Sequence, residues 1–118
     1  LPSMELDIHR IIRAITNLLE NAIDALGHSG GLIRIETHWK DEEMVLCLSD
    51  SGPGIMPEHL PYIFDPFFTT KKGAAGTGFG LANVKKIVEE HGGSVSAESE
   101  PGRGSKFIIR IPCKATNE

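Results

Sequence analysis

Two glycine-rich turns constrain this sequence more than any other feature. The first spans residues 50–55 (Asp-Ser-Gly-Pro-Gly-Ile), and the second spans residues 76–81 (Gly-Thr-Gly-Phe-Gly-Leu). Glycine lets the main chain approach a phosphate closely and offers unhindered N–H donors. The second turn leads directly into an amphipathic helical pattern, whose N-terminus favours an anion. Neither turn is specific alone, but with a preceding helix that carries Asn17 and Asn21 they indicate a purine nucleotide site.

The length of the chain limits the number of domains, and its charge argues against nucleic-acid binding. A chain of 118 residues, 40% of them hydrophobic, can form one compact core but not two, so residues 1–118 are expected to form a single domain. The formal charge is −4 and the twelve Lys and Arg residues are scattered, so no nucleic-acid partner is expected.

The expected location is the cytoplasm. No apolar run approaches the roughly 20 residues of a membrane span, so this domain is not expected to contact a membrane directly. Cys47 and Cys113 lack a paired spacing, which favours reduced thiols. Because the sequence starts at Leu1 rather than Met, we expect a segment of a longer protein, which could itself be membrane-anchored.

The first half of the chain predicts a helix followed by a hairpin. Apolar residues recur at helical spacing between Asp7, a suitable N-cap, and Gly27, a suitable stop. Residues 33–40 alternate apolar and polar, and after a turn at Asp41 and Glu42 the next run is again typical of a strand.

The second half repeats this order after a less regular stretch. Residues 57–63 predict a short helical turn and residues 64–76 a mobile loop. Residues 81–88 predict a helix that ends at His91-Gly-Gly, and residues 95–111 predict a hairpin around the turn 101–104. The expected class is α+β, a two-layer sandwich with a mixed, mainly antiparallel sheet and helices on one face.

The first helix places three polar side chains near one another. At about 100° per residue, Asn17 and Asn21 lie about 40° apart, and Asp24 lies about 20° from Asn17. We expect this face to lie opposite the apolar stripe. It is then either a solvated surface or a set of oxygen ligands for a hydrated Mg²⁺ ion.

Asp50 shares the strand parity of the apolar residues Leu46 and Leu48, so its carboxylate is expected to be buried at a strand end. A buried carboxylate requires donors. Nearby backbone N–H groups in an Asx-type turn would supply them. The exocyclic amine of adenine would satisfy the same requirement and would select against guanine.

Residues 64–72 combine three phenylalanines with Lys71 and Lys72, and Phe79 follows just beyond. One interpretation is a lid whose lysine reaches a terminal phosphate. The alternative is a surface loop anchored by Phe64 and Phe67.

Four motifs in one order carry a family resemblance. They are Asn17-Leu-Leu-Glu-Asn21-Ala, Asp50-Ser-Gly-Pro-Gly54, Phe64-Asp-Pro-Phe-Phe-Thr-Thr-Lys71 and Gly76-Thr-Gly-Phe-Gly80-Leu. They resemble the N, G1, F and G2 boxes of two-component sensor histidine kinases, with an F box similar to that of nitrogen-regulation-type kinases. The segment 102–107 resembles the turn before the family's last strand, so the resemblance spans nearly the whole chain.

The resemblance implies the Bergerat sandwich shared with gyrase, heat-shock chaperone and mismatch-repair ATPases. It implies ATP and Mg²⁺ as cofactors, Asn21 as the Mg²⁺ ligand, Asn17 as its neighbour near the phosphates and Asp50 as the adenine reader. Lys71 as a phosphate contact is our extension. The expected nucleotide-binding residues are Asp50, Gly52, Gly54, Ile55, Phe64, Thr70, Gly76, Thr77, Gly78, Phe79, Gly80 and Leu81. Asp24 stands where many of these kinases have lysine, which leaves the positive partner of the γ-phosphate open.

The residue at position 17 distinguishes ATP hydrolysis from phosphoryl transfer among the proteins that this chain resembles. The hydrolytic relatives carry a water-activating glutamate one turn before the Mg²⁺-binding asparagine, whereas this chain has Asn17 there. An amide cannot act as a general base. Glu20 lies about 100° around the helix from Asn21 and is not assigned that role. Slow hydrolysis and transfer of the γ-phosphoryl group to an external imidazole are therefore expected.

The acceptor is not expected within this chain. The family's phosphorylated histidine lies on a separate helical hairpin and is commonly followed by an acidic residue. None of the five histidines here has that context: His9, His28, His38, His59 and His91. The expected partners are the helical dimerisation and phosphoacceptor domain of the same kinase and, downstream, a response regulator. An anti-sigma-type serine kinase and a non-catalytic, nucleotide-responsive binding module remain as alternatives.

Overall fold

The computed structural model describes residues 7–66 and 80–112 of the chain. Within these ranges, two α-helices, two short 3-10 turns and four strands follow one another. In chain order they are α1 (Ile8–Leu26), η1 (Gly27–Ser29), β1 (Ile33–Lys40), β2 (Glu43–Asp50), η2 (Leu60–Tyr62), α2 (Gly80–Glu90), β3 (Ser94–Glu100) and β4 (Gly104–Pro112).

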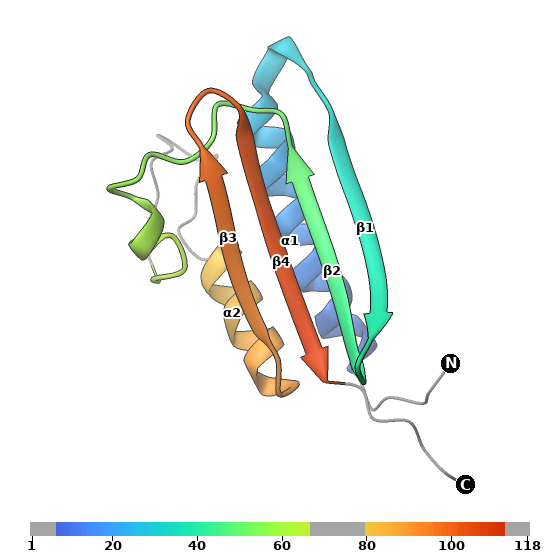
Figure 1. Ribbon diagram of the computed structural model, residues 1–118. Coiled ribbons are helices and arrows are strands. Elements are labelled where there is room, and N and C mark those ends of the chain that lie inside the picture. Colours follow the sequence, from blue (N-terminus) through green and yellow to red (C-terminus); the bar gives the residue numbers. More distant parts are fainter. Residues whose placement is uncertain (1–6, 67–79, 113–118) are drawn as a thin grey trace, which may run out of the picture.

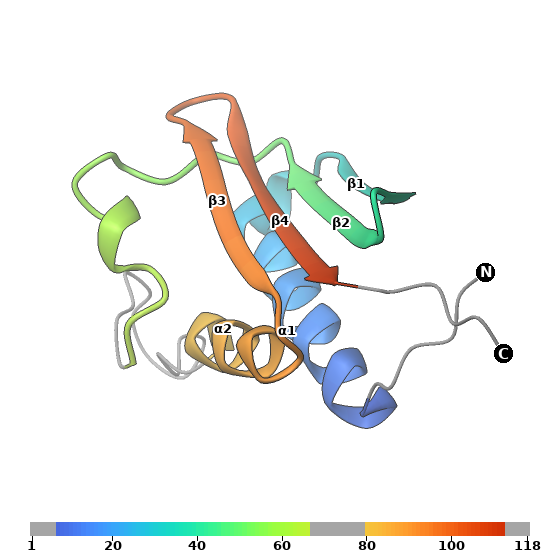
Figure 2. The ribbon, with the colours of Figure 1, turned by 60° about the horizontal axis from the view of Figure 1, so that its bottom comes forward.

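The strands form one sheet in the order β1-β2-β4-β3. All three pairings are antiparallel, so the parallel part of the expected mixed sheet is not found among the described strands. Both helices lie on the same side of the sheet (Figures 1 and 2). This arrangement confirms the predicted α+β sandwich and the predicted order of elements.

Local sequence signals set the ends of α1. The Asp7 carboxylate accepts a hydrogen bond from the backbone N–H of Arg10 at 3.2 Å, as an N-cap should. At the other end Gly27 has a φ of 61°, and its N–H bonds the carbonyl of Ile23. Both predicted helix ends are therefore confirmed.

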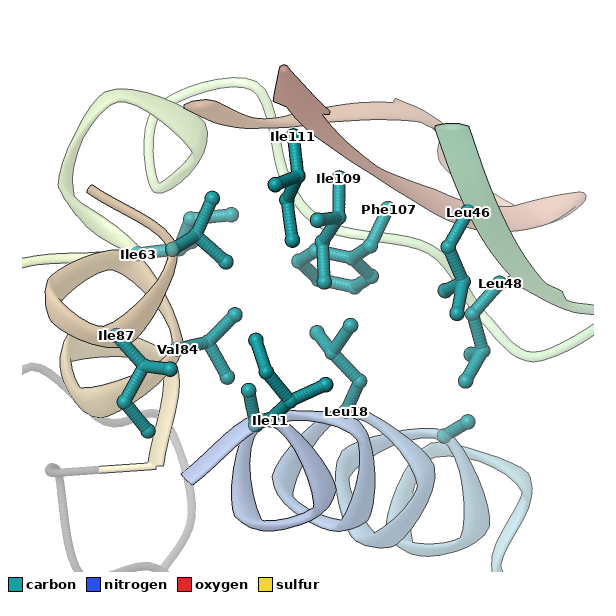
Figure 3. Close-up of a cluster of buried hydrophobic side chains, with 13 residues drawn as sticks. Ile11, Leu18, Leu46, Leu48, Ile63, Val84, Ile87, Phe107, Ile109 and Ile111 are labelled. Carbon is teal, nitrogen blue, oxygen red and sulfur yellow. The ribbon is translucent and has the colours of Figure 1, made fainter. Parts of the chain in front are cut away.

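The core lies between the sheet and the two helices (Figure 3). α1 contributes a stripe at spacings of three and four residues, and β2, β4 and α2 contribute the facing side chains. The most deeply buried large side chains are Phe107, Leu18, Leu48, Ile111, Val84 and Val88. Because antiparallel register places Leu48 directly opposite Phe107, the two central strands present one continuous apolar face.

β1 forms one edge of the sheet and is largely exposed. Its turn to β2 contains Asp41 and Glu42, whose φ angles of 55° and 59° match the mirror-image turns that suit a hairpin. On the helix-facing side of the strand, Ile35 is still 48% exposed and Trp39 45% exposed. The core is thus centred on β2 and β4 rather than on the first hairpin as a whole.

Candidate functional site

Asp50 is the best-defined polar group of the predicted site. It ends β2 on the helix-facing side, with only 7% of its surface exposed. Its Oδ1 atom accepts a hydrogen bond from the backbone N–H of Gly52 at 2.8 Å, and its Oδ2 atom accepts one from the Ser105 hydroxyl at 2.8 Å. The expected burial is confirmed, and the Gly52 contact is the Asx-type turn that was one of the two suggested sources of donors. A carboxylate has about four acceptor positions, so these two donors leave capacity for another.

The first glycine-rich turn is held by the turn between β3 and β4. The N–H of Gly102 donates to the carbonyl of Pro53 at 2.7 Å, and the N–H of Ile55 donates to the Ser99 hydroxyl at 2.6 Å. The Ser99 hydroxyl in turn donates to the carbonyl of Gly104 at 3.1 Å. The turn is therefore held by two hydrogen bonds from a segment more than forty residues away in sequence, and the third bond orients the Ser99 hydroxyl.

Close packing explains two of the glycines at this end. A Cβ atom on Gly54, whose φ is 81°, would lie 2.6 Å from the carbonyl oxygen of Glu100. A Cβ atom on Gly52 would lie 2.9 Å from Oδ1 of Asp50 and 3.2 Å from the carbonyl oxygen of Ala25, in the last turn of α1. The turn after β2 thus lies against the end of α1, one helical turn beyond Asn21.

The two asparagines of α1 are half-buried, while Asp24 is exposed. The prediction that Asn17 and Asn21 lie opposite the apolar stripe is wrong. The buried stripe runs through Ala14, Leu18 and Ala22, and by helical spacing Asn21 lies about 60° from Leu18. Asn17 and Asn21 therefore border the core side of the helix instead of its solvent side, which suits groups that line a site better than a freely solvated surface.

Other predicted site residues are placed less directly. The Phe64 ring packs edge-on against Phe107, with ring centroids 6.2 Å apart, which confirms Phe64 as an anchor of its segment. Gly80 is the first residue of α2, and the partly buried Leu81 packs against the core. The remaining predicted residues lie outside the described residues: Thr70, Lys71, Gly76, Thr77, Gly78 and Phe79.

A hollow of about 560 Å³ lies between residues 64–66 and one side of α2. Its lining includes Phe64, Asn83 and Lys86 but neither Asp50 nor the two asparagines of α1. It is therefore distinct from the end of the sheet where Asp50 lies.

Sequence reasoning missed Ser99 and Ser105. Ser105 lies in the segment that resembles the family's last turn, and its parity on β4 places it on the buried face. That parity was the available signal. Ser99 gave no comparable signal, because its role depends on how the two turns meet.

Protein side chains alone do not form a metal site in the described part of the chain. Within residues 7–66 and 80–112, no group of three or more His, Cys, Asp or Glu side chains is arranged to hold a metal ion. A metal bound near Asn21 would need oxygen ligands from a nucleotide and from water. In the same ranges, no helix combines the length and apolar character needed to cross a membrane.

Comparison with known proteins identifies the class of this fold and site. Residues 6–115 match the family of histidine kinase-, DNA gyrase B- and HSP90-like ATPases. The chain therefore belongs to this family.

Similar proteins narrow the assignment to the kinase branch. The chain is 40% identical over 118 residues to the sensor histidine kinase ZraS of Escherichia coli, a match that covers 100% of the chain and 25% of ZraS. It is 41% identical over 110 residues to the sensor protein SrrB of Staphylococcus aureus, covering 90% of the chain and 19% of SrrB. The chain thus spans a quarter or less of the length of these relatives.

Solved structures give the same answer. The catalytic domain of the histidine kinase ThkA aligns with a TM-score of 0.80 and 40% identity, over 92% of this chain and 70% of that one. Full-length ShkA in complex with AMPPNP aligns with a TM-score of 0.84 and 27% identity, over 100% of this chain and 24% of ShkA. The chain is an ATP-binding catalytic domain of the sensor histidine kinase type, as the motifs predicted.

Proposed function

We propose that this domain holds adenine through Asp50 and delivers the γ-phosphoryl group of ATP to a histidine on a separate helical domain. The observation that carries the proposal is the buried Asp50 carboxylate, oriented by Gly52 and Ser105, with acceptor capacity to spare. An exocyclic amine of adenine is a donor that would use this capacity. A guanine carbonyl at the same position would face the carboxylate without a proton between them.

The residues near the end of α1 fit a magnesium-bound triphosphate. Mg²⁺ favours oxygen ligands and keeps several waters, so it requires few protein groups. Asn21 offers an amide oxygen from a half-buried position, one turn before the segment that packs on Gly52. When bound, Mg²⁺ would neutralise charge on the phosphates. We assign Asn21 to the metal and Asn17 to the neighbouring phosphate region, and Lys71 stays a predicted phosphate contact.

The proposed chemistry is transfer rather than hydrolysis. In this step the bond between the γ-phosphorus of ATP and the oxygen that bridges it to the β-phosphorus breaks. A bond forms between the γ-phosphorus and an imidazole nitrogen of the acceptor, and ADP leaves. Asn17 cannot remove a proton from water, and Glu20 is on the exposed side of α1. The domain would therefore act by positioning the nucleotide and offsetting its charge.

The proposed partners follow from this chemistry. Residues 1–118 would act as one catalytic unit beside a helical dimerisation domain that carries the acceptor histidine, and a response regulator would accept the phosphoryl group afterwards. Because ATP is supplied in the cytoplasm, we place the domain there.

The test combines a binding and a transfer measurement. Titration of the domain with ATP, with and without Mg²⁺, should show binding that Mg²⁺ strengthens. Addition of the helical domain of the same kinase should then give a phosphorylated product that is labile in acid and stable in base. An acid-stable phosphoserine would favour the serine-kinase alternative. ATP binding without labelling of a competent acceptor would contradict the transfer proposal.

A further inference from the structure

His91 connects the end of α2 to the start of α1. Its Nε2 atom lies 3.1 Å from the backbone nitrogen of Asp7, and its Nδ1 atom lies 2.8 Å from the carbonyl oxygen of Ile87. A carbonyl oxygen only accepts, so Nδ1 must carry a proton. A backbone N–H only donates, so Nε2 must present a lone pair. Both contacts are therefore satisfied by one form of the ring, the neutral tautomer protonated at Nδ1.

This contact replaces a missing part of the α1 N-cap. In a capping box the residue at the third helical position reaches back to the backbone N–H of the N-cap residue, using a Glu or Gln side chain. Here that position is Arg10, whose guanidinium has no acceptor. The first half of the box is present, because the Asp7 carboxylate accepts from the N–H of Arg10 at 3.2 Å. His91, the residue that follows α2, supplies the second half.

The surrounding charges are already engaged with one another. Arg10 forms an ion pair with Glu90, the last residue of α2, beside the His91 contact. Arg110, on the strand that packs against Gly93, pairs with Glu43 at 3.3 Å. Asp7 and Glu90 would attract a protonated His91 ring and Arg10 would repel it. The Asp7 carboxylate accepts from the Arg10 N–H and the Glu90 carboxylate pairs with the Arg10 guanidinium, so the acceptor that the Asp7 N–H contacts is Nε2 of His91.

We propose that His91 is a proton-sensitive cap that holds the first turn of α1 to the end of α2. Protonation would convert Nε2 from an acceptor into a donor that faces the Asp7 N–H, so the contact would be lost. Imidazole ordinarily changes charge between pH 5 and 8, within the physiological range. The neutral ring makes the contact, so the cap is complete while His91 is neutral and is lost when acidification protonates it.

The cap joins two helices that both carry residues of the predicted nucleotide site. The start of α1 and the end of α2 lie at the same end of the molecule, opposite the end where β2 leads into the first glycine-rich turn (Figure 1). α1 carries Asn17 and Asn21, and α2 begins at Gly80, within the second glycine-rich segment of the sequence. The cap therefore joins the two helices that position the nucleotide residues, at the point where the chain enters α1.

The first test reads the tautomer directly. ¹⁵N NMR of the side-chain nitrogens of His91, in the unaltered domain at pH 8, should show a protonated Nδ1 and an unprotonated Nε2. A ring protonated at Nε2 at this pH would overturn the proposal.

The second test reads the cap through hydrogen exchange of the Asp7 amide. Its protection factor, corrected for intrinsic exchange rates, should fall roughly five- to tenfold between pH 8 and pH 5.5, as expected for the loss of one hydrogen bond. His91→Gln should abolish this pH response. His9→Gln, which alters an exposed histidine in the same first turn, should preserve it. An Asp7 protection factor that stays constant with pH in the unaltered domain would overturn the proposal.

Discussion

The Ser105 hydroxyl on β4 donates a 2.8 Å hydrogen bond to the Asp50 carboxylate at the end of β2. These residues are 55 positions apart in sequence but directly opposite each other in the register of the two strands. The backbone N–H of Gly52 binds the other oxygen of the same carboxylate. The charged group that we assign to adenine is thus oriented both by its own turn and by the neighbouring strand.

Ser105→Ala should reduce both stability and ATP affinity. The substitution removes a donor from a buried carboxylate, which costs roughly 1–3 kcal/mol in unfolding free energy. Denaturant unfolding and an ATP titration should both register the change. Ser96→Ala, on the exposed face of β3, serves as the control and should leave both values unchanged. Equal stability of the two variants would show that Ser105 contributes nothing to holding Asp50.

Asp50→Ala should weaken ATP binding about tenfold or more, because a hydrogen bond to a charged acceptor is worth roughly 1.5–3 kcal/mol. A comparison of ATP with GTP separates this role from general damage to the fold. The unaltered domain should prefer ATP, and the variant should lose most of that preference. If the ATP-to-GTP affinity ratio is the same in both proteins, Asp50 does not read the base.

Asn21→Ala should remove the part of nucleotide binding that depends on Mg²⁺. With Mg²⁺ in excess the affinity for ATP should fall about tenfold or more, as expected when a metal site loses a contributing group. With a chelator present, the variant and the unaltered domain should bind ATP equally. Asn83→Ala, at another half-buried asparagine, is the control. A loss of affinity that is the same with and without Mg²⁺ would assign Asn21 to the nucleotide rather than to the metal.

Local signals in the sequence predicted most of the fold. Asp7 and Gly27 act through contacts within a few residues, so the ends of α1 could be placed from composition and spacing alone. The turn at Asp41 and Glu42 is similarly local. Asp50 was predicted to be buried because strand parity links it to Leu46 and Leu48, and this parity survives any choice of partner strand.

Contacts between elements that are distant in sequence could not be predicted from local signals. Ile8, Ile12 and Ile23 follow the helical period, yet they are 56%, 53% and 54% exposed because no described element covers that side of α1. Periodicity shows that a helix has an apolar side, but not how much of it a neighbour covers. The contacts of Ser99 and His91 depend likewise on where turns and helix ends meet in space.

The final prediction concerns Gly54, which lies where the two turns beside Asp50 meet. Gly54 and Gly102 have nearly equal φ angles of 81° and 83°, so alanine at either position incurs a similar backbone penalty, about 1–2 kcal/mol. The two sites differ in space, because a Cβ atom on Gly54 would lie 2.6 Å from the carbonyl oxygen of Glu100, whereas a Cβ atom on Gly102 meets nothing within 4 Å. Gly54→Ala should therefore lower the unfolding free energy by at least about 1 kcal/mol more than Gly102→Ala, since it adds a steric collision to the same strain. It should also weaken ATP binding more, because relief of the collision displaces the turn that follows Asp50. Denaturant unfolding and ATP titration of both variants provide the comparison, and equal losses would mean that the backbone angle alone requires glycine at position 54.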